Sequence, residues 1–193
     1  RIFKLGMMAV VLSLCFSGCV IKAGRKPSET EESSKSDKKS DTEFSKGDYI
    51  GETYINKQFD ISFDAKSNGY KFDELYKSAT EAYLEEDMLK YIGMGGAPVV
   101  VYATKDGDSS SKVGISIDDI ESDIDAYVDN VIKSNKNSQK TEMEFCNKEV
   151  PCVETESKDS SGKKIYRYTV YIQSGKYVAV IDSFGEDKDE AKK

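Results

Sequence analysis

The chain has 193 residues and a formal net charge of −7, and 33% of its residues are charged. Most of the negative charge lies after Asp48, which argues against nucleic-acid binding, because phosphate contacts need clustered Lys and Arg. The sequence contains no His, which excludes Ser-His-Asp and Cys-His nucleophiles and removes the commonest metal ligand. We therefore expect a protein that is not an enzyme and that holds no metal and no cofactor.

Residues 1–18 have the three regions of a secretory signal peptide. Arg1 and Lys4 form a basic start, residues 5–16 are an apolar run too short to span a bilayer, and Ser17 and Gly18 are small. The sequence begins with Arg instead of Met and stops where a helix should continue, so we expect further residues at both ends.

A lipid anchor is the most specific expectation. Phe16-Ser17-Gly18-Cys19 resembles the bacterial lipobox, whose usual form is Leu, then Ala or Ser, then Gly or Ala, then Cys. The resemblance implies cleavage between Gly18 and Cys19, a thioether from Cys19 to diacylglycerol, and a location on the extracytoplasmic face of the cell membrane. A Cys suits this chemistry because its thiolate is nucleophilic at neutral pH, and two acyl chains anchor a protein stably. The alternative is an ordinary cleaved signal in which Cys19 has no role.

Residues 19–47 are interpreted as the anchored Cys and a charged linker. Lys, Ser, Glu, Asp and Thr dominate this segment, and apolar side chains are nearly absent after Ala23. Such a composition cannot bury enough surface to offset the entropy of ordering, so we expect a flexible coil with a reach of roughly 30 Å. The linker would hold a folded domain, residues 48–193, away from the membrane.

The first half of the domain is expected to alternate hairpins with a helix. An extended segment at residues 49–55 precedes period-two alternation at 59–63, which predicts a strand. An amphipathic helix should run from near Asp73 to just before Gly93, with its apolar stripe toward the sheet. Apolar residues at 99–103 and 113–117 predict two strands joined at Asp106-Gly107. The stripe of the helix is formed by Phe72, Leu75, Tyr76, Ala79, Ala82, Tyr83 and Leu89.

The second half is expected to hold one more complete helix and four strands. A helical stripe runs from Ile120 to Ile132, and Ser122 with Asp125 looks like a capping-box variant. Strands are predicted at residues 143–145, 150–155, 165–173 and 177–184, and a closing helix at 186–193. Because the strands come in hairpins, the fold class should be α+β, with a mainly antiparallel sheet covered by two or three amphipathic helices.

Four segments carry a resemblance to the PsbP/Mog1-like α/β/α sandwich. They are residues 54–63, 69–72 and 113–117 and the terminal hairpin around residues 175–177. The resemblance covers roughly residues 48–193 and extends to lipoproteins of low-GC Gram-positive bacteria whose function is not established. It implies a sandwich of the kind whose members bind proteins, and it supplies no set of catalytic residues.

Two cysteines leave several interpretations open. If residues 147–151 form a hairpin turn, Cys146 and Cys152 face each other, and a disulfide is permitted outside the cytoplasm. The alternatives are two free buried thiols or a redox pair. Without His or a closer spacing, the two thiols are poor zinc ligands.

Other polar clusters are weaker candidates. The turn at Asp106 and Asp108 resembles the start of a calcium loop, but Ser111 and Ile117 stand where Gly and Glu are required, so an exposed turn is the better interpretation. The carboxylates at residues 85–87 and 118–125 are expected to be solvated on helix surfaces.

Tyrosines of the last hairpin are the best candidates for a binding surface, since exposed Tyr is favoured at interfaces. They are Tyr166, Tyr168, Tyr171 and Tyr177, and core packing is the alternative for at least half of them.

The leading hypothesis is a membrane-tethered, extracytoplasmic, non-catalytic module that binds an envelope protein or a wall component. The first alternative is an accessory subunit of a membrane transporter or sensor complex, and the second is a hydrolase that uses paired carboxylates. A deep pocket with two close carboxylates would favour the hydrolase, whereas an exposed apolar or tyrosine patch would favour binding.

Overall fold

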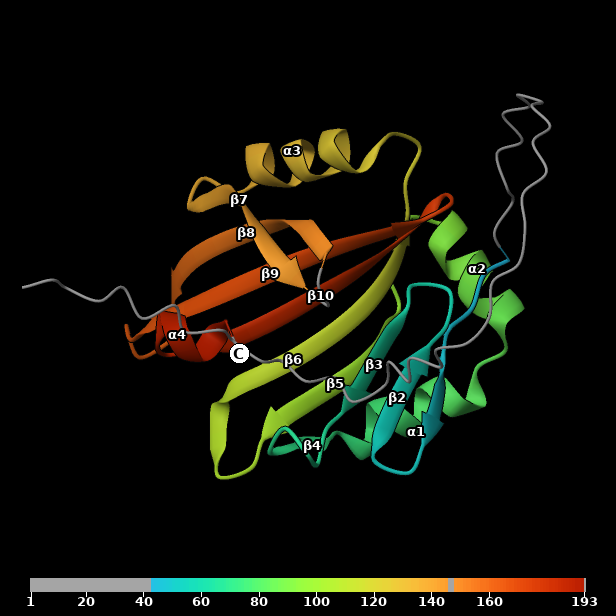
Figure 1. Ribbon diagram of the computed structural model, residues 1–193, viewed down its shortest axis with the longest axis horizontal. Helices are drawn as coiled ribbons and strands as arrows, with labels where there is room; N and C mark the ends of the chain where they lie inside the picture. Colours follow the sequence, from blue (N-terminus) through green and yellow to red (C-terminus); the bar gives the residue numbers. More distant parts are fainter. Residues whose placement is uncertain (1–42, 146–147, 193) are drawn as a thin grey trace, which may run out of the picture.

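The computed structural model describes residues 43–145 and 148–192, and within them the chain forms ten strands and four helices (Figure 1). No helix in these residues is long and apolar enough to cross a membrane. In chain order the elements are β1 (Asp48–Ile50), β2 (Thr53–Asn56), β3 (Ile61–Asp64), β4 (Tyr70–Phe72), α1 (Glu74–Ala82), α2 (Glu85–Gly93), β5 (Val99–Lys105), β6 (Asp108–Asp119), α3 (Ile124–Ser134), β7 (Ser138–Phe145), β8 (Lys148–Lys158), β9 (Lys164–Ser174), β10 (Tyr177–Gly185) and α4 (Lys188–Ala191).

The strands form two sheets, and every pairing in the described residues is antiparallel. One sheet has the order β1-β2-β3, and the other has the order β4-β5-β6-β10-β9-β8-β7. The predicted α+β class with a mainly antiparallel sheet is confirmed. The strand content is higher than expected, because the extended segment at 49–55 is two strands and the short β4 had no clear alternation.

Different elements pack on the two faces of the large sheet. Val170 of β9 belongs to a core with Ile61 and Phe63 of β3, whereas the next residue, Tyr171, belongs to a separate core with Val128 of α3. Successive strand residues point to opposite faces, so β9 serves both cores. Figure 1 shows α3 along one side of the large sheet and β2 and β3 on the other. Helix cover is therefore confirmed for α3, but the opposite face is covered mainly by the small sheet, together with α2.

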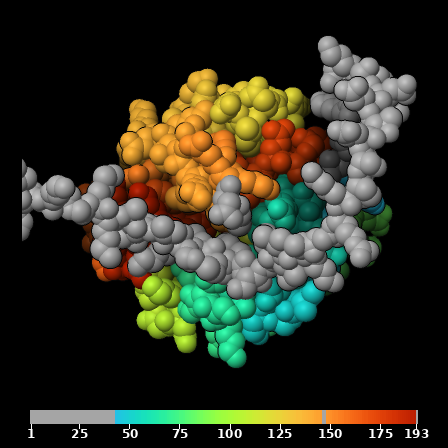
Figure 2. Space-filling view, in the orientation of Figure 1, coloured from blue at the N-terminus to red at the C-terminus, as the bar shows by residue number. Residues whose placement is uncertain are grey.

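The small sheet is seen from outside in the space-filling view. Its residues (blue-green) lie on the lower side of the visible face, and those of β7 and β8 (orange) lie on the upper side (Figure 2). Period-two alternation explains this packing, since Ile61 and Phe63 point inward while Ser62 and Asp64 stay half-exposed.

The single helix predicted from Asp73 to residue 92 is two helices, α1 and α2, separated by extended backbone at Tyr83 and Leu84. Asp73 caps α1 as expected, because its carboxylate accepts from the backbone N–H groups of the second and third residues that follow. The break coincides with Lys46, whose Nζ donates to the carbonyl oxygens of Thr80 and Tyr83 at 2.6 Å each. Carboxylates in the first turn of α2 favour a new helix start there.

The other predicted helix ends are close to the observed ones. α3 starts at an N-cap on Asp123, which accepts from the backbone N–H of Ala126 at 2.9 Å, one residue later than the predicted Ser122 cap. The predicted closing helix is the short α4, capped by Asp187. The hairpin about Ser174 and Gly175 is confirmed, since Ser174 pairs with Tyr177.

The folded domain begins before the predicted boundary at Asp48. Phe44 is only 5% exposed, and its ring meets that of Tyr177 edge-on with the centroids 5.3 Å apart. Asn56 donates from Nδ2 to the carbonyl of Ser45 at 2.9 Å. Gly47 has φ +77° and packs so closely on Tyr54 that an added Cβ would lie 2.6 Å from the Tyr54 hydroxyl. The last residues assigned to the linker are therefore part of the core.

Phe44→Ala is expected to lower the free energy of unfolding by about 3 kcal/mol, because it leaves a cavity beside Tyr177. Denaturant unfolding of the full chain measures the loss. Glu43→Ala is the matched control, since Glu43 is exposed and should change stability by less than about 0.5 kcal/mol. Equal stability of the Phe44→Ala and Glu43→Ala chains would contradict a domain that starts at Phe44.

Candidate binding surface

The edge of β5 sets the position of α1. β4 pairs only with the last three residues of β5, so the beginning of β5 lacks a strand partner on that side. Its carbonyl groups find other donors. The oxygen of Val100 accepts from the hydroxyls of Thr80 at 3.1 Å and Tyr49 at 2.7 Å, and the oxygen of Tyr102 accepts from the N–H of Asp73 at 2.8 Å. An unpaired strand edge requires such donors, so α1 turns a polar side toward β5.

The polar row of α1, formed by the buried Thr80 and the half-buried Lys77, faces the protein in consequence. Thr80 is 2% exposed, and Lys77, three residues earlier on the same row, donates from Nζ to the carbonyl of Gly51 at 3.2 Å and lies over the ring of Tyr49. In most surface helices the apolar row is buried and the polar row is solvated. The orientation of α1 is the reverse.

The apolar row of α1 consequently faces solvent. Leu75 is 76% exposed and Tyr83 is 56% exposed, while Tyr76 is partly supported by the ring of Tyr102, 5.1 Å away between centroids. The prediction that this row faces the sheet is wrong, because the backbone groups of the β5 edge take the polar row instead. We call this surface the α1 stripe and define it as Leu75, Tyr76, Ala79, Ala82 and Tyr83.

Exposed apolar side chains continue from the α1 stripe along α2. Leu84 is 60% exposed and Met94 is 78% exposed. In the described part of the chain, all large hydrophobic residues that are exposed lie between Ile50 and Val99. Single exposed hydrophobics are ordinary, but their concentration on one segment is characteristic of an interaction site.

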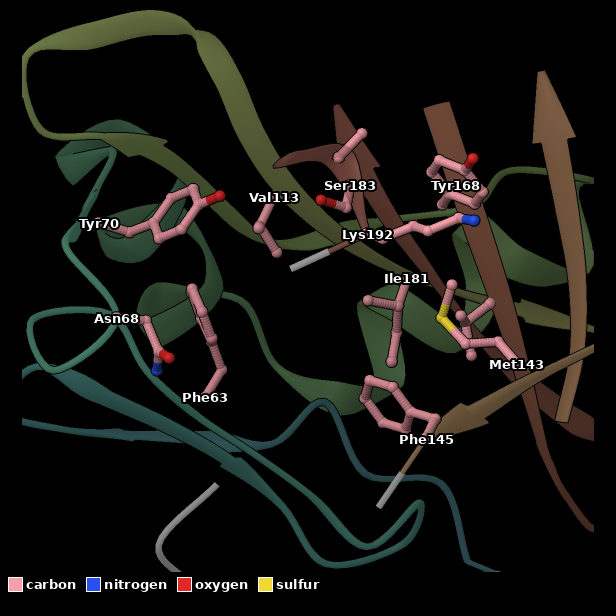
Figure 3. Close-up of a pocket in the computed structure, with 12 residues that line it drawn as sticks. Phe63, Asn68, Tyr70, Val113, Met143, Phe145, Tyr168, Ile181, Ser183 and Lys192 are labelled. Atoms are coloured by element: carbon pink, nitrogen blue, oxygen red, sulfur yellow. The ribbon is translucent and has the colours of Figure 1, made fainter. Parts of the chain in front are cut away.

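A second feature is an apolar pocket between the two sheets (Figure 3). Phe63 of β3, Val113 of β6, Tyr168 of β9 and Ile181 of β10 contribute to its wall, and α4 lies at its rim. Its volume is about 70 Å³, well below the roughly 300 Å³ at which ligand pockets begin. The pocket therefore fits a single small apolar group at most, and it has too little room for a cofactor.

A polar hollow lies beside α4 and contains two carboxylates, Glu154 and Glu156. Glu154 contacts Lys188, which holds the pKa of its carboxyl below the usual range, and Glu156 pairs with Lys164 at 2.7 Å. A glycosidase acid needs the opposite shift, because it must be protonated near neutral pH. The pKa of Glu154 is thus shifted in the direction opposite to that of such an acid.

A second pair of carboxylates, Glu142 of β7 and Glu149 of β8, is exposed. Glu149 and Glu142 approach each other on β7 and β8, and the hydrogen bond with Glu142 raises the pKa of Glu149. Both side chains are exposed and lie outside the pocket and the polar hollow. Within the described ranges, no three His, Cys, Asp or Glu side chains are grouped as ligands for a metal.

The predicted turn and helix carboxylates have structural partners. Asp108 accepts from the hydroxyls of Ser110 at 2.5 Å and Ser111 at 2.7 Å and from the N–H of Ser110 at 2.9 Å, and these bonds lower the pKa of its carboxyl. Asp118 accepts from the hydroxyl of Tyr127 at 2.8 Å, and Asp125 pairs with Lys140 at 2.9 Å. These bonds hold the start of β6 and join the first turn of α3 to β6 and β7.

The predicted tyrosine surface is wrong for three of its four residues. Tyr168, Tyr171 and Tyr177 are buried, and Tyr166 is half-buried. Tyr171 packs in the core under α3, whereas Tyr168 and Tyr177 belong to the core on the other face. The alternation of the strands separates the side chains, so core packing accounts for them. Tyr168 alone contributes to a hollow, the apolar pocket.

The cysteine predictions are only partly within the described residues. Gly18, Cys19 and Cys146 lie outside them. Cys152 is buried with a free thiol and pairs with Thr141 of β7 in the strand register. Residues 148–151 belong to the paired strand β8, so the predicted turn over 147–151 is wrong for them. Burial raises the pKa of the Cys152 thiol to about 11, which keeps it protonated at neutral pH.

The α1 stripe was missed by sequence reasoning. The spacing of the apolar residues showed that α1 has an apolar row, but the same spacing suits a row turned toward the core or toward solvent.

No family model matches the chain, and a search of curated proteins gives no match.

Cys152 should react slowly with a maleimide in the native protein. With the pKa raised from 9.0 to about 11, roughly 100-fold less thiolate is present at pH 8. A variant that keeps Cys152 and has Ser at the other three cysteines should react at least about 100-fold faster in denaturant than in buffer. Equal rates in the two conditions would contradict a buried thiol. Restoring Cys146 then tests the disulfide, which would remove both thiols from the unfolded, unreduced chain.

Proposed function

We propose that this chain is a lipid-anchored protein of the extracytoplasmic membrane face whose domain binds another protein of the cell envelope and catalyses no reaction. The anchor would be a diacylglycerol thioether on Cys19, with fatty acids such as palmitate, after cleavage behind Gly18. The order of basic, apolar and small residues in the first 18 positions supports the anchor. The charged segment that follows would act as a spacer between membrane and domain.

The outward α1 stripe is the observation that carries the binding function. Burial of the apolar row by a partner would be favourable by roughly 25 cal/mol for each Å² of apolar surface removed from water. The helix does not reduce this exposure by rotating, because Thr80 and Lys77 are held by the edge of β5 and by Gly51. A protein partner that covers the row removes the exposed surface at no loss of those hydrogen bonds.

We also propose that the domain is a PsbP/Mog1-like sandwich. A large antiparallel sheet with α3 on one face and α2 on the other supports this assignment. Protein binding agrees with the function that the resemblance implies. If the partner is a transporter or a sensor, the chain would be an accessory subunit of that complex, using the same stripe.

Cys19→Ala should abolish incorporation of radiolabelled palmitate and release the protein from the membrane fraction or leave it uncleaved. Only the thiol of residue 19 can form the thioether to diacylglycerol. Labelling followed by fractionation and mass spectrometry of the N-terminus measures both effects. Cys152→Ala is the control and should label normally. Normal labelling of the Cys19→Ala chain would show that the lipobox interpretation is wrong.

In intact cells, the amount of partner protein cross-linked to the double variant Leu75→Ser/Tyr83→Ser should be about 90% lower than with the wild-type chain. The reason is that the variant truncates two exposed side chains of the α1 stripe. Quantitative mass spectrometry of the cross-linked product measures the loss. Glu121→Ser/Glu144→Ser truncates two exposed side chains away from α1, and this control should keep the product. A product that survives in the stripe variant and disappears in the control would place binding elsewhere.

A further inference from the structure

We infer that the α1 stripe binds a basic amphipathic helix of its protein partner, an inference that rests on the binding function proposed above. The apolar row would meet the apolar row of the partner helix. The surrounding acidic side chains would meet Lys and Arg on its flanks.

One border of the stripe is acidic. Glu74, Ser78 and Glu81 have the helical spacing i, i+4 and i+7, which places them in the row next to Leu75, Ala79 and Ala82. All three side chains of this border are exposed. Glu74 and Glu81 make no ion pair with any residue that the structure describes.

The far end of the stripe is acidic as well. The first turn of α2, directly after Leu84, holds Glu85, Glu86 and Asp87, and all three are exposed. Glu85 accepts a hydrogen bond from the backbone N–H of Lys46 at 3.1 Å. A partner that covers Tyr83 and Leu84 would come within reach of this turn.

The lysines nearby are engaged in other contacts. Lys77 directs its Nζ to the carbonyl of Gly51 at 3.2 Å, on the inner side of α1, and Lys46 directs its Nζ to the carbonyl of Thr80 at 2.6 Å, at the C-terminal end of α1. Lys90 pairs with Asp87 at 3.2 Å. The partner therefore meets a negative surface around an apolar row, and complementary charge calls for Lys and Arg.

The shape of the stripe suits a helix. Ala79 and Ala82 are small and lie between the larger Leu75 and Tyr83, so a second helix can approach the middle of α1 closely. Packed helices have an axis separation of about 8–10 Å. The nine residues of α1 give a length of about 13 Å, enough for two to three turns of the partner.

Charge disfavours two other occupants. A second copy of this chain would bring two acidic borders together, and an anionic lipid surface would repel the same carboxylates. We therefore favour a basic protein helix over self-association and over direct contact with lipid headgroups.

The test uses the purified full chain and two fluorescent synthetic peptides with the same Leu stripe, one with Lys and one with Glu at every polar position. Fluorescence anisotropy should show binding of the Leu/Lys peptide, at least about tenfold tighter than the Leu/Glu peptide at low salt and weakened by 0.5 M salt. Binding of the Leu/Glu peptide with equal affinity through the stripe would overturn the inference while leaving the binding function intact.

Variants of the α1 stripe and of its acidic border test whether the peptide binds there. The affinity for the Leu/Lys peptide should fall by about tenfold or more in each of two double variants, Leu75→Ser/Tyr83→Ser and Glu74→Lys/Glu81→Lys. Glu121→Lys/Glu144→Lys adds the same charge at exposed positions away from α1 and should change affinity less than about twofold, which excludes nonspecific attraction. Unfolding midpoints confirm that all variants are folded. Equal weakening by both charge-reversal pairs, or no effect of the stripe pair, would overturn the inference.

Two further measurements address the other occupants. The wild-type and Leu75→Ser/Tyr83→Ser chains should self-associate by light scattering and sediment with vesicles of phosphatidylglycerol to the same extent, because both keep the same N-terminal segment. Self-association or vesicle binding that Leu75→Ser/Tyr83→Ser abolishes would overturn the inference in favour of a second copy or a lipid surface.

Discussion

The unpaired beginning of β5 is the constraint on which the surface of this domain depends. Buried carbonyl groups need hydrogen-bond donors, and β4 is too short to supply them beyond Ala103. Thr80, Tyr49 and the N–H of Asp73 fill that need, and each comes from α1 or its surroundings. A helix that must place donors on a sheet edge cannot also place its apolar row there. The outward α1 stripe is the physical result.

The same region joins the folded domain to the segment that precedes it. Lys46 closes the carbonyl end of α1, and its own N–H is bonded to Glu85 at the start of α2. Phe44, two residues earlier, is inserted against Tyr177 of the large sheet. The N-terminal end of the described chain is therefore fixed beside the α1–α2 break, next to Tyr83. A spacer that ends at this point would present the stripe in a defined direction relative to its own attachment.

Acidic side chains fall into two groups with different roles. On the large sheet, Asp182 accepts two bonds from Arg167 at 2.7 and 2.8 Å and one from Thr169 at 2.7 Å, and Glu154 contacts Lys188. Both carboxylates have hydrogen-bond partners, Asp182 across the β9–β10 pair and Glu154 on α4. Glu74 and Glu81, by contrast, are exposed and unpaired within the described residues. Their charge is available to a partner, and it borders the only helix whose apolar row faces water in this part of the chain.

The sequence by itself determined the class of the fold and several local elements, although it predicted α1 and α2 as one helix and a turn at residues 148–151. Alternation in residues 59–63 and 113–117, the turn at Asp106-Gly107 and the hairpin about Ser174 all depend on neighbours in the chain, and the structure contains each of them. The tertiary structure alone decided which side of α1 is buried, because that side depends on the distant edge of β5. It also decided that Tyr168 and Tyr171 lie in separate cores and that Phe44 belongs to the domain. Hydrophobic periodicity and composition indicate the secondary structure of a segment, whereas burial of its faces depends on which other parts of the chain pack against it.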